Sequence, residues 1–565
     1  MSLFLLTNKR QKAEIAKETW LDLFRCAEIY ELNNGLFLTF TNAYRKKKHF
    51  YKKYKNNSIF GFGTFFSENG FFDNAITSSI DLSRFTANTA DDLYGHYIFV
   101  IESENKVRFV TDKIGLLNVF WTQKEDEIFV SNDLVLIAGV SENSRLSEIG
   151  VQQFVLNESC IGTNTIFEDI NRVKNGYELI VTESMIEQNK IYDYRPEKLN
   201  FKEYVDRIKH YFSMVAKYEG EIAADMSAGY DTRLVASSAY KYIKNLMTIT
   251  NRNQFDKGVD MATSPLVAQK LKLPIEIINN LIKWDINYGF LLHGFIVGRN
   301  VIRSKDWLSI IKEKYNKADL MLGGYGGEIL RGKYNNYKDY KEFAYFYYKG
   351  KNVFKYLYKK NDYTTLLAKE LKLLYPLNEG ISNHQLGNWL YTMDRMRIWG
   401  GSPVTMMSLY GDVLHPFMDW YLINPIFMWN PKELKSAYLQ KKITEYFSPG
   451  ITKIPFNADS KNILLKELKN PHSIQLNLIK KYNKYYRYFK RKIGYRFIFE
   501  VKKKRERNNI YSIYPRENFS NDFLQKCNLN LNTLEKYGVP DNISRLATVQ
   551  MAMERALELL GKSEN

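Results

Sequence analysis

The sequence predicts a multidomain protein of the α/β and α+β classes, with an antiparallel β-rich part followed by a parallel α/β part. Three observations predict this architecture. The chain has 565 residues, more than one hydrophobic core usually holds. Short aromatic and β-branched runs follow one another closely before residue 200. Strand-like and helix-like runs alternate after that point, which is typical of parallel sheets.

The first strand-like runs lie between residues 58 and 140. They are too closely spaced for intervening helices, which predicts an antiparallel sheet. A second group follows at 164–184, around a Lys-Asn-Gly turn. The clearest runs of the first group are HYIFVIES, KVRFVTD, NVFWTQK and EIFVSND.

The pattern changes near residue 200. Residues 199–220 have helical periodicity and end in glycine. The order strand, helix, strand, helix, strand then predicts a doubly wound parallel sheet. The rest of the chain, from about residue 340, is predicted to be mostly helical. The five predicted elements cover residues 221–226, 231–245, 246–251, 259–272 and 274–279.

The composition is that of a soluble globular protein, with 45% apolar and 25% charged residues. No run approaches the roughly 20 apolar residues of a membrane helix, and the first residues do not have the order of an export signal. Cys26, Cys160 and Cys527 are far apart, which argues against a cysteine-ligated metal. We therefore expect a cytoplasmic protein without a membrane span.

The formal net charge is +19, so nucleic acid, anionic lipid or an anionic substrate are candidate partners. Two basic blocks contribute, at 44–57 and 480–507. Aromatic residues between the charges of the second block are typical of single-strand binders. They are also typical of a solvated helical face, and this second interpretation is favoured.

The segment IAADMSAGYDTRLVASS carries the first candidate site. Its turn follows the first strand of the parallel unit, where doubly wound sheets bind ligands. Ala228 and Gly229 allow a tight turn whose amides can point at one anion. Ser227 and Thr232 can donate hydroxyl hydrogen bonds, and Asp231 fits beside a phosphate if Mg²⁺ lies between them. The turn predicts a pyrophosphate cradle, with an ordinary helix N-cap as the alternative.

A second loop follows the apolar strand at 319–322, in ADLMLGGYGGEILRG. Its four glycines around Tyr325 allow close backbone approach to a ligand. Glu328 supplies a second carboxylate for a metal. Two such loops in one parallel unit, each with an acid, indicate a nucleotide and metal site more strongly than either loop alone.

The two loops resemble motifs of the asparagine synthetase family. SAGYDT is similar to that family's SGGxDS loop, and LGGYGGEILRG to its second loop, usually SGEGxDExxxG. HPFMDWYL, at 415–422, resembles the PFLD segment, and GITKIPF contains Lys453 about where the family keeps a catalytic lysine. DDLYGHYIFVI and VTDKIGLLNVFW resemble the glutaminase-like domain. These matches occur in family order over roughly residues 58–460.

The resemblance implies a glutaminase-like (Ntn-type) β-sandwich at 1–200, a PP-loop ATP-pyrophosphatase domain at 201–470 and a basic helical extension at 471–565. It implies ATP and Mg²⁺ as cofactors. Lys453 and Tyr325 are the implied catalytic residues, and Asp231 and Glu328 the implied metal ligands. The implied contacts to ATP and pyrophosphate are Met226, Ser227, Ala228, Gly229, Asp231, Thr232, Thr250, Gly323 and Gly324.

Several residues depart from the family pattern. The family's glutaminase uses an N-terminal cysteine, whereas this chain has Ser2, whose hydroxyl needs an activating base. We therefore expect that glutamine hydrolysis is lost and that the domain remains as a scaffold. Ala228 stands for a glycine, and Glu328 stands for an aspartate, which changes the geometry open to a metal.

Tyr325 replaces an acid of the glutamine-dependent members. The same replacement is found in β-lactam synthetase and carbapenam synthetase, where the tyrosine acts with a glutamate in base catalysis. No glutamate partner is evident here, since the alignment puts Gly400 near that position. A base, a substrate-orienting hydroxyl and a stacking surface therefore all remain open as roles for Tyr325.

The resemblance implies an ATP-dependent, AMP-forming carbon–nitrogen ligase. It would adenylate a carboxylate, release pyrophosphate and pass the acyl group to an amine or ammonia. The expected partners are a small-molecule, sugar-acid or peptide carboxylate and an amine donor, with a homodimer as a candidate assembly and no nucleic acid. The alternatives are an inactive nucleotide- or partner-binding member and a tRNA-modifying PP-loop enzyme.

Overall fold

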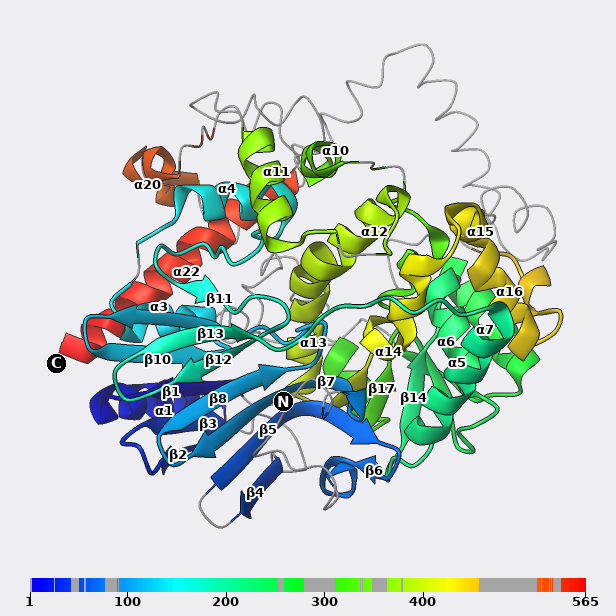
Figure 1. Cartoon of the computed structure of the whole chain (residues 1–565), viewed down its shortest axis with the longest axis horizontal. Helices are drawn as coiled ribbons and strands as arrows, with labels where there is room; N and C mark the ends of the chain where they lie inside the picture. Colours follow the sequence, from blue (N-terminus) through cyan, green and yellow to red (C-terminus); the bar gives the residue numbers. More distant parts are fainter. Residues whose placement is uncertain are drawn as a thin grey trace.

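The computed structural model describes most of the chain (Figure 1). None of the helices in this part has the length and apolarity that a membrane crossing demands. The basic block at 480–507, most of the block at 44–57, and Ser2 lie outside the described residues. The described residues are 3–24, 26–41, 50–54, 57–76, 89, 91–143, 145–251, 259–278, 310–335, 337, 339–347, 363–377, 380–456, 516–519, 521–527, 529, 531 and 540–564.

Two antiparallel sheets form the N-terminal unit, as the sequence predicts. Their aromatic faces meet, with the ring of Phe4 stacked on Phe62 at 5.1 Å and on Phe109 at 5.6 Å. The first sheet has the order β11 (Asn171–Arg172), β9 (Phe120–Lys124), β10 (Glu127–Ser131), β1 (Leu3–Thr7), β3 (Phe37–Thr41), β2 (Ala27–Glu31). The second has the order β13 (Ile186–Lys190), β12 (Tyr177–Val181), β8 (Lys106–Thr111), β7 (Tyr94–Ser103), β5 (Asn57–Ser67), β4 (Phe50–Tyr54), and β6 (Gly70–Phe71) pairs with β5.

Helices cover the outside of the first sheet, and the last helix of the chain is one of them (Figure 1). α22 (Pro540–Glu564) packs against α1 (Arg10–Leu23), α3 (Leu134–Val140) and α4 (Glu148–Asn157). The Arg545 guanidinium donates to the carbonyls of Val155 and Leu156 at the end of α4, where cations are favoured. The C-terminal helix therefore packs against the N-terminal unit.

A five-stranded parallel sheet forms the second unit, in the order β16 (Ile275–Ile278), β15 (Met247–Asn251), β14 (Ile222–Asp225), β17 (Leu320–Leu322), β18 (Asp412–Leu414). All four strand pairs are parallel, as predicted for a doubly wound sheet. The chain runs outward from β14 through β15 to β16 and then returns to β17 on the other side of β14. The strand order therefore reverses between β14 and β17.

Helices make up most of the remaining described chain, and the predicted helical character after residue 340 is confirmed there. The longer ones are α5 (Phe201–Val215), α6 (Tyr230–Ala239), α7 (Val259–Leu271), α10 (Tyr340–Tyr347), α11 (Tyr363–Leu374), the π-helix η6 (Tyr391–Gly400), α13 (Gly401–Ser408) and α16 (Tyr438–Phe447). The shorter ones are η1 (Phe72–Ala75), η3 (Gly327–Arg331), η5 (Asn383–Gln385), α12 (Leu386–Leu390), η7 (Pro416–Met418), α14 (Trp420–Ile423), η8 (Asn424–Met428), α15 (Pro431–Leu434), η9 (Lys435–Ala437), η10 (Ile451–Lys453), η11 (Arg516–Asn518) and α20 (Asn521–Lys526).

The two units meet along β18, a strand that the sequence pattern did not predict. Thr64 of β5 donates its hydroxyl to Asp412 at 3.0 Å and accepts the backbone N–H of Val413 at 3.1 Å. The N–H of His415 donates to the His96 Nε2 of β7 at 3.1 Å. Side chains of the N-terminal unit thus take the place of a further strand on the outer side of β18.

The π-helix η6 is a second link between the units. Asp394 accepts the Gly162 N–H at 2.8 Å, and Arg397 donates to the carbonyl of Gly115 at 2.9 Å. At its other end the Tyr391 hydroxyl donates to Glu328, which lies just after β17. One helix therefore contacts both the N-terminal unit and the edge of the parallel sheet.

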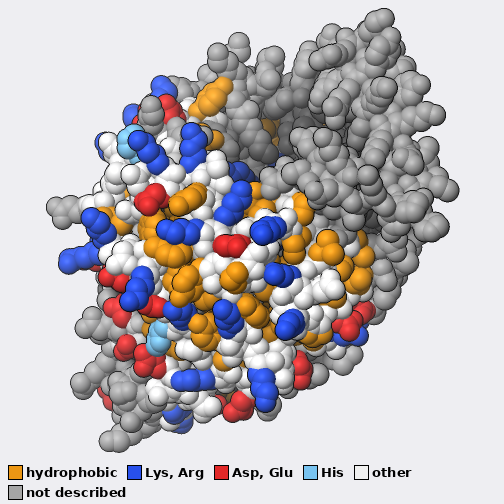
Figure 2. All heavy atoms as spheres, turned by 90° about the vertical axis from the view of Figure 1, so that its right-hand side faces the viewer, with side chains coloured by type: hydrophobic (Ala, Val, Ile, Leu, Met, Phe, Trp, Pro, Cys, Tyr) orange, Lys and Arg blue, Asp and Glu red, His pale blue; other side chains and the backbone are white. Residues whose placement is uncertain are grey.

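Lysines lie over aromatic rings on the face formed partly by α5, α6 and α16, and Figure 2 shows basic side chains spread among apolar ones there. Lys442 Nζ is 4.2 Å from the ring centre of Phe201, and Lys209 Nζ is 5.3 Å from that of Tyr446. Part of the positive charge is thus carried by a solvated helical face whose side chains rest their stems on apolar surface.

The contact between α3 and α22 generates a stability prediction. A Cβ at Gly139 would lie 2.5 Å from the Leu559 Cβ and 3.0 Å from the Ala556 carbonyl oxygen. Gly139→Ala must therefore push α22 away, and we expect a loss of about 1–3 kcal/mol in the free energy of unfolding. The measurement is the urea midpoint followed by far-UV circular dichroism.

The matched control for this prediction is Gly561→Ala, also on α22. A Cβ there would meet no atom within 4 Å, so this helix glycine should be replaced without loss or with a gain of up to about 1 kcal/mol. Equal urea midpoints for both variants would contradict the packing of α22 on α3.

Candidate functional site

The two predicted loops lie side by side at the point where the strand order reverses. β14 and β17 are parallel neighbours, with Ala223 opposite Met321 and Ala224 opposite Leu322. Both loops therefore leave the same edge of the sheet. In doubly wound sheets this is the place where ligands bind, because the crossovers on its two sides diverge.

The first loop is closed by its own hydroxyl groups. Ser227 and Thr232 form a hydrogen bond between their side chains at 2.8 Å, and the Gly229 N–H donates to the Ser227 hydroxyl at 3.1 Å. Asp260 of α7 accepts the Ala228 N–H at 2.6 Å. Gly229 is the N-cap residue of α6 and has no side chain to place over the first turn. The helix N-terminus is thus presented at the sheet edge, a favourable place for an anion.

The second loop packs directly on the first. A Cβ at Gly324 would lie 2.8 Å from the Thr232 nitrogen, and one at Gly327 would lie 2.6 Å from Asp231 Oδ1. Gly326 has φ +89°, and a Cβ there would lie 2.0 Å from the carbonyl oxygen of Phe417. The glycines that the sequence associates with a close ligand are therefore required first by the contact between the loops and with the chain after β18.

Asp231 is held from two directions. Arg331 donates to its Oδ2 at 2.9 Å, and Gln440 of α16 donates to its Oδ1 at 2.8 Å. Burial raises the pKa of Asp231 to about 6, Arg331 opposes this rise, and Glu328 adds to it. The side chain remains 24% exposed, so the carboxylate is accessible from one side. Two cations, Arg331 and Lys333, and a second acid, Glu328, therefore act on the Asp231 carboxylate.

Glu328 is the second acid of the site. Its Oε1 accepts the Tyr391 hydroxyl at 2.6 Å, and its Oε2 accepts the Gly326 N–H at 3.1 Å. Since each carboxylate oxygen has two lone pairs, both acids keep acceptor capacity. The two carboxylates fit Mg²⁺, which usually takes one or two protein carboxylates and completes its shell with water and phosphate. The Arg331 guanidinium competes with such a cation for Asp231.

Clusters of three or more potential metal ligands are absent from the described residues. A cation at Asp231 and Glu328 would therefore take its remaining ligands from a bound substrate or water. This is consistent with an ion that arrives with a phosphate and not with a permanent structural metal.

Tyr325 lies against His415. Their ring centres are 4.6 Å apart, and the Tyr325 N–H donates to His415 Nδ1 at 3.3 Å. The ring of Trp399 in η6 lies edge-on to the tyrosine ring, with 6.2 Å between the two ring centres. Burial lowers the pKa of His415 to about 3, so the imidazole is neutral and packs against the tyrosine as an uncharged aromatic ring. The structure thus places Tyr325 in an aromatic stack beside the second loop.

The other predicted contacts surround the same edge. Met226 directly follows β14, and its N–H donates a hydrogen bond to the Ile249 carbonyl of β15 at 2.8 Å. Thr250 is buried near the end of β15 and contacts Ser264 at 3.3 Å. Gly323 directly follows β17, and a Cβ there would lie 2.0 Å from the His415 ring. These residues lie near the ends of three neighbouring strands.

Lys453 lies in a segment that α6 ties to the first loop. Arg233 donates to the carbonyls of Ile454 and Pro455 at 2.7 and 3.0 Å. Phe456 stacks on Tyr230, the residue before Asp231, at 4.1 Å. Lys453 itself is exposed. The predicted catalytic lysine is therefore carried next to the predicted pyrophosphate loop.

Sequence reasoning missed the side chains that hold the two acids in place. They are Arg331, Tyr391 and Gln440, and Asp260 plays the same part for the first loop. Arg331 could have been found, because it lies three residues after Glu328 on the same short helix. The others are separated from their partners by tens to hundreds of residues and belong to no recognised motif.

No protein-family profile matches the chain, and no curated protein does. Among solved structures the chain is similar to glutamine phosphoribosylpyrophosphate amidotransferase from B. subtilis in complex with ADP and GMP, at 12% identity and a TM-score of 0.25, covering 59% of this chain and 77% of that one. It is also similar to a structure titled as the allosteric regulatory enzyme of purine biosynthesis, at 9% identity and a TM-score of 0.25, covering 49% and 80%. Similarity at this level carries no information on what this chain binds or does.

The pair Arg331 and Asp231 generates a pH prediction. With its pKa near 6, Asp231 is largely neutral below that pH, so the ion pair exists only above it. Because the folded state holds this proton more tightly than the unfolded state, stability falls as pH rises from about 4 to 6. Arg331→Met should therefore cost about 1–2 kcal/mol at pH 8 and less than about 0.5 kcal/mol at pH 4.5.

The measurement is the free energy of urea unfolding at both pH values. Asp231→Asn is the matched background, since in it Arg331→Met should have the same small effect at pH 4.5 and at pH 8. A cost of Arg331→Met that does not depend on pH in the otherwise unchanged protein would show that Asp231 is not its titrating partner.

Proposed function

We propose that the chain is an ATP-dependent ligase that joins a carboxylate to an amine, releasing AMP and pyrophosphate. The observation that supports this most is the meeting of the two glycine-rich loops at the reversal of strand order, with one carboxylate from each loop. The resemblance of those loops to the asparagine synthetase family supplies the reaction type. Its carboxylate is proposed to belong to a small molecule, a sugar acid or a peptide.

In the proposed reaction a carboxylate oxygen attacks the α-phosphorus of ATP, and the bond to the bridging oxygen breaks as pyrophosphate leaves. The amine nitrogen then attacks the acyl carbon, loses a proton and displaces AMP. Mg²⁺, when bound, offsets charge on the phosphate oxygens. Every other contribution comes from groups of the chain itself.

The first loop and the start of α6 are proposed to hold pyrophosphate through backbone N–H groups and the hydroxyls of Ser227 and Thr232. Asp231 and Glu328 are proposed to hold the cation, and Lys453 to offset charge on the α-phosphate. Tyr325, held against His415, is proposed to orient the substrate. Burial of the His415 imidazole supports a fixed position for the tyrosine ring.

One observation favours a second candidate, a nucleotide-binding protein without ligase activity. The Arg331 guanidinium already lies on Asp231 at 2.9 Å, where the cation would be expected. An arginine there can take the place of a metal ion as the partner of Asp231, and its guanidinium can also bind phosphate directly. Such a protein would bind nucleotide without needing Mg²⁺.

The test of the binding site is calorimetric titration of ATP with and without Mg²⁺. We expect ATP binding that requires Mg²⁺. Asp231→Asn or Glu328→Gln should lower the affinity at least about tenfold, which is the contribution of one charge-assisted hydrogen bond. Asp206→Asn, an exposed acid on α5, is the control that should bind as the unaltered protein does. Binding that needs no Mg²⁺ would favour the second candidate, and no binding at millimolar ATP would contradict both.

Lys453→Ala separates the ligase from the binder. It should leave the affinity for Mg·ATP within about threefold and lower carboxylate-dependent release of pyrophosphate by about 10²-fold or more, since it removes a charge that acts in the transition state. The assay is pyrophosphate release across a panel of amino acids, sugar acids and peptides. Equal release by the variant and the unaltered protein would remove Lys453 from the mechanism.

A further inference from the structure

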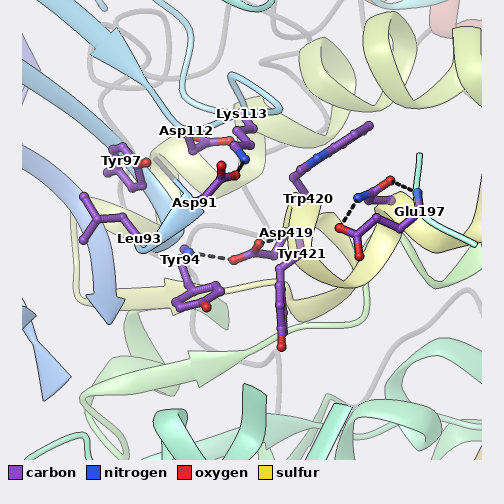
Figure 3. Close-up of a pocket in the computed structure, with 12 residues that line it drawn as sticks. Asp91, Leu93, Tyr94, Tyr97, Asp112, Lys113, Glu197, Asp419, Trp420 and Tyr421 are labelled. Carbon is purple, nitrogen blue, oxygen red and sulfur yellow. Dashed lines mark hydrogen bonds and ion pairs between the residues drawn. The ribbon is translucent and has the colours of Figure 1, made fainter. Parts of the chain in front are cut away.

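A small cavity lies between the N-terminal unit and the parallel-sheet unit, and none of the residues that line it belongs to the two loops (Figure 3). Its volume is about 70 Å³. β7 and the turn after β8 form one wall, and the start of α14 forms the other. It is lined by an unusual combination of buried acids and aromatic rings.

Asp112 is the central group of this cavity. Its Oδ1 accepts the N–H groups of Ile114 and Gly115 at 3.1 and 3.0 Å, which closes the turn after β8. Its Oδ2 is buried and has no hydrogen-bond partner among the described residues. The residue is only 5% exposed. A buried carboxylate oxygen without a partner costs free energy, which a donor in the cavity would recover.

Asp419 lies opposite, at the N-cap of α14. Its oxygens accept the N–H groups of Tyr421 at 3.0 Å and of Gly95 at 2.7 Å. Burial is the main cause that raises the pKa of Asp112 to about 7 and that of Asp419 to about 6, and the charge of Asp419 raises that of Asp112 further. Two buried acids thus face one cavity.

The nearby cations are drawn to other acids. Lys113 pairs with Asp91, and Arg207 pairs with Glu197. Lys113 attracts Asp419 at longer range, but neither Asp112 nor Asp419 forms an ion pair within the part of the chain that the structure describes. The cavity therefore has an excess of negative charge and a free acceptor.

Aromatic rings complete the walls. Tyr94, Tyr97, Trp420 and Tyr421 line the cavity, and Figure 3 shows Trp420 and Tyr421 on the two sides of Asp419. Aromatic faces attract organic cations, and they do so more strongly where water is excluded. The described residues hold no cluster of three metal ligands, which argues against a bare metal ion here.

We propose that this cavity binds a small primary ammonium group, which donates to Asp112 Oδ2 and lies against the aromatic walls. Its volume suits ammonium or methylammonium, since it exceeds the roughly 10–15 Å³ that a cavity needs to hold one water. This inference is separate from the proposed ligase activity and needs no nucleotide. The site would take a free amine or the terminal amine of a short chain that reaches in from solvent.

The test is the thermal unfolding midpoint in methylammonium chloride, compared with sodium chloride at equal ionic strength. A saturable rise above the sodium chloride series is expected, because a ligand that binds only the folded state stabilises it. Asp112→Asn keeps the Oδ1 acceptor of the turn and removes the charge, so half-saturation should need at least about tenfold more methylammonium. Asp126→Asn, an exposed acid on the β9–β10 hairpin, should leave half-saturation unchanged.

A second variant works in the opposite direction and does not rely on Asp112. Lys113→Gln removes the cation that lines the cavity, so the methylammonium concentration at half-saturation should fall at least about threefold. Tetraethylammonium, too large for the cavity, should give no rise above sodium chloride. The proposal fails if methylammonium does not raise the unfolding midpoint above the sodium chloride series, or if tetraethylammonium raises it equally. It also fails if neither variant shifts half-saturation. Any of these results would indicate that the cavity holds only water.

Discussion

The outer side of β18 is the constraint on which the rest of the structure depends. A three-residue edge strand cannot leave its backbone groups unpaired in a buried position. Thr64 and His96 of the N-terminal unit accept the backbone N–H groups of Val413 and His415, and the Gly95 N–H donates to the Asp419 side chain further along the same segment. Because β18 also pairs with β17, the sandwich holds the sheet edge where the two loops meet.

The same constraint explains why polar groups gather in two places. Where the β18 segment passes the second loop, His415 is neutral and fixes the backbone of Tyr325. Where it passes the turn after β8, Asp419 comes to face Asp112. At the first place, glycines of the second loop allow its backbone to pack closely on the β18 segment, whereas at the second place a cavity remains. One short segment therefore contributes to both the proposed nucleotide site and the proposed ammonium site.

The sequence predicted those parts of the fold that repeat a local pattern. An apolar run marks the strand at 222–225 and a helix-like run follows it, and the glycines of the second loop follow an apolar strand, so both loops could be placed. β18 is too short to have a pattern, and the strands β1 to β4, which lie before the runs that begin at residue 58, were not predicted. The contact of Gln440 with Asp231 spans 209 residues, and no local rule encodes such a contact. The assigned roles of the site residues stay predictions.

The π-helix η6 has a consequence for comparing this chain with others by alignment. Its hydrogen bonds join residues five apart, so its turns are wider than those of an α-helix. A register counted with the α-helical period drifts along Tyr391–Gly400, and a position matched at its start no longer matches at its end. A relative with a regular helix here would need a gap within this segment. Gly400 is therefore a poor guide to the residue that faces Tyr325, and homologous positions should be assigned by superposition.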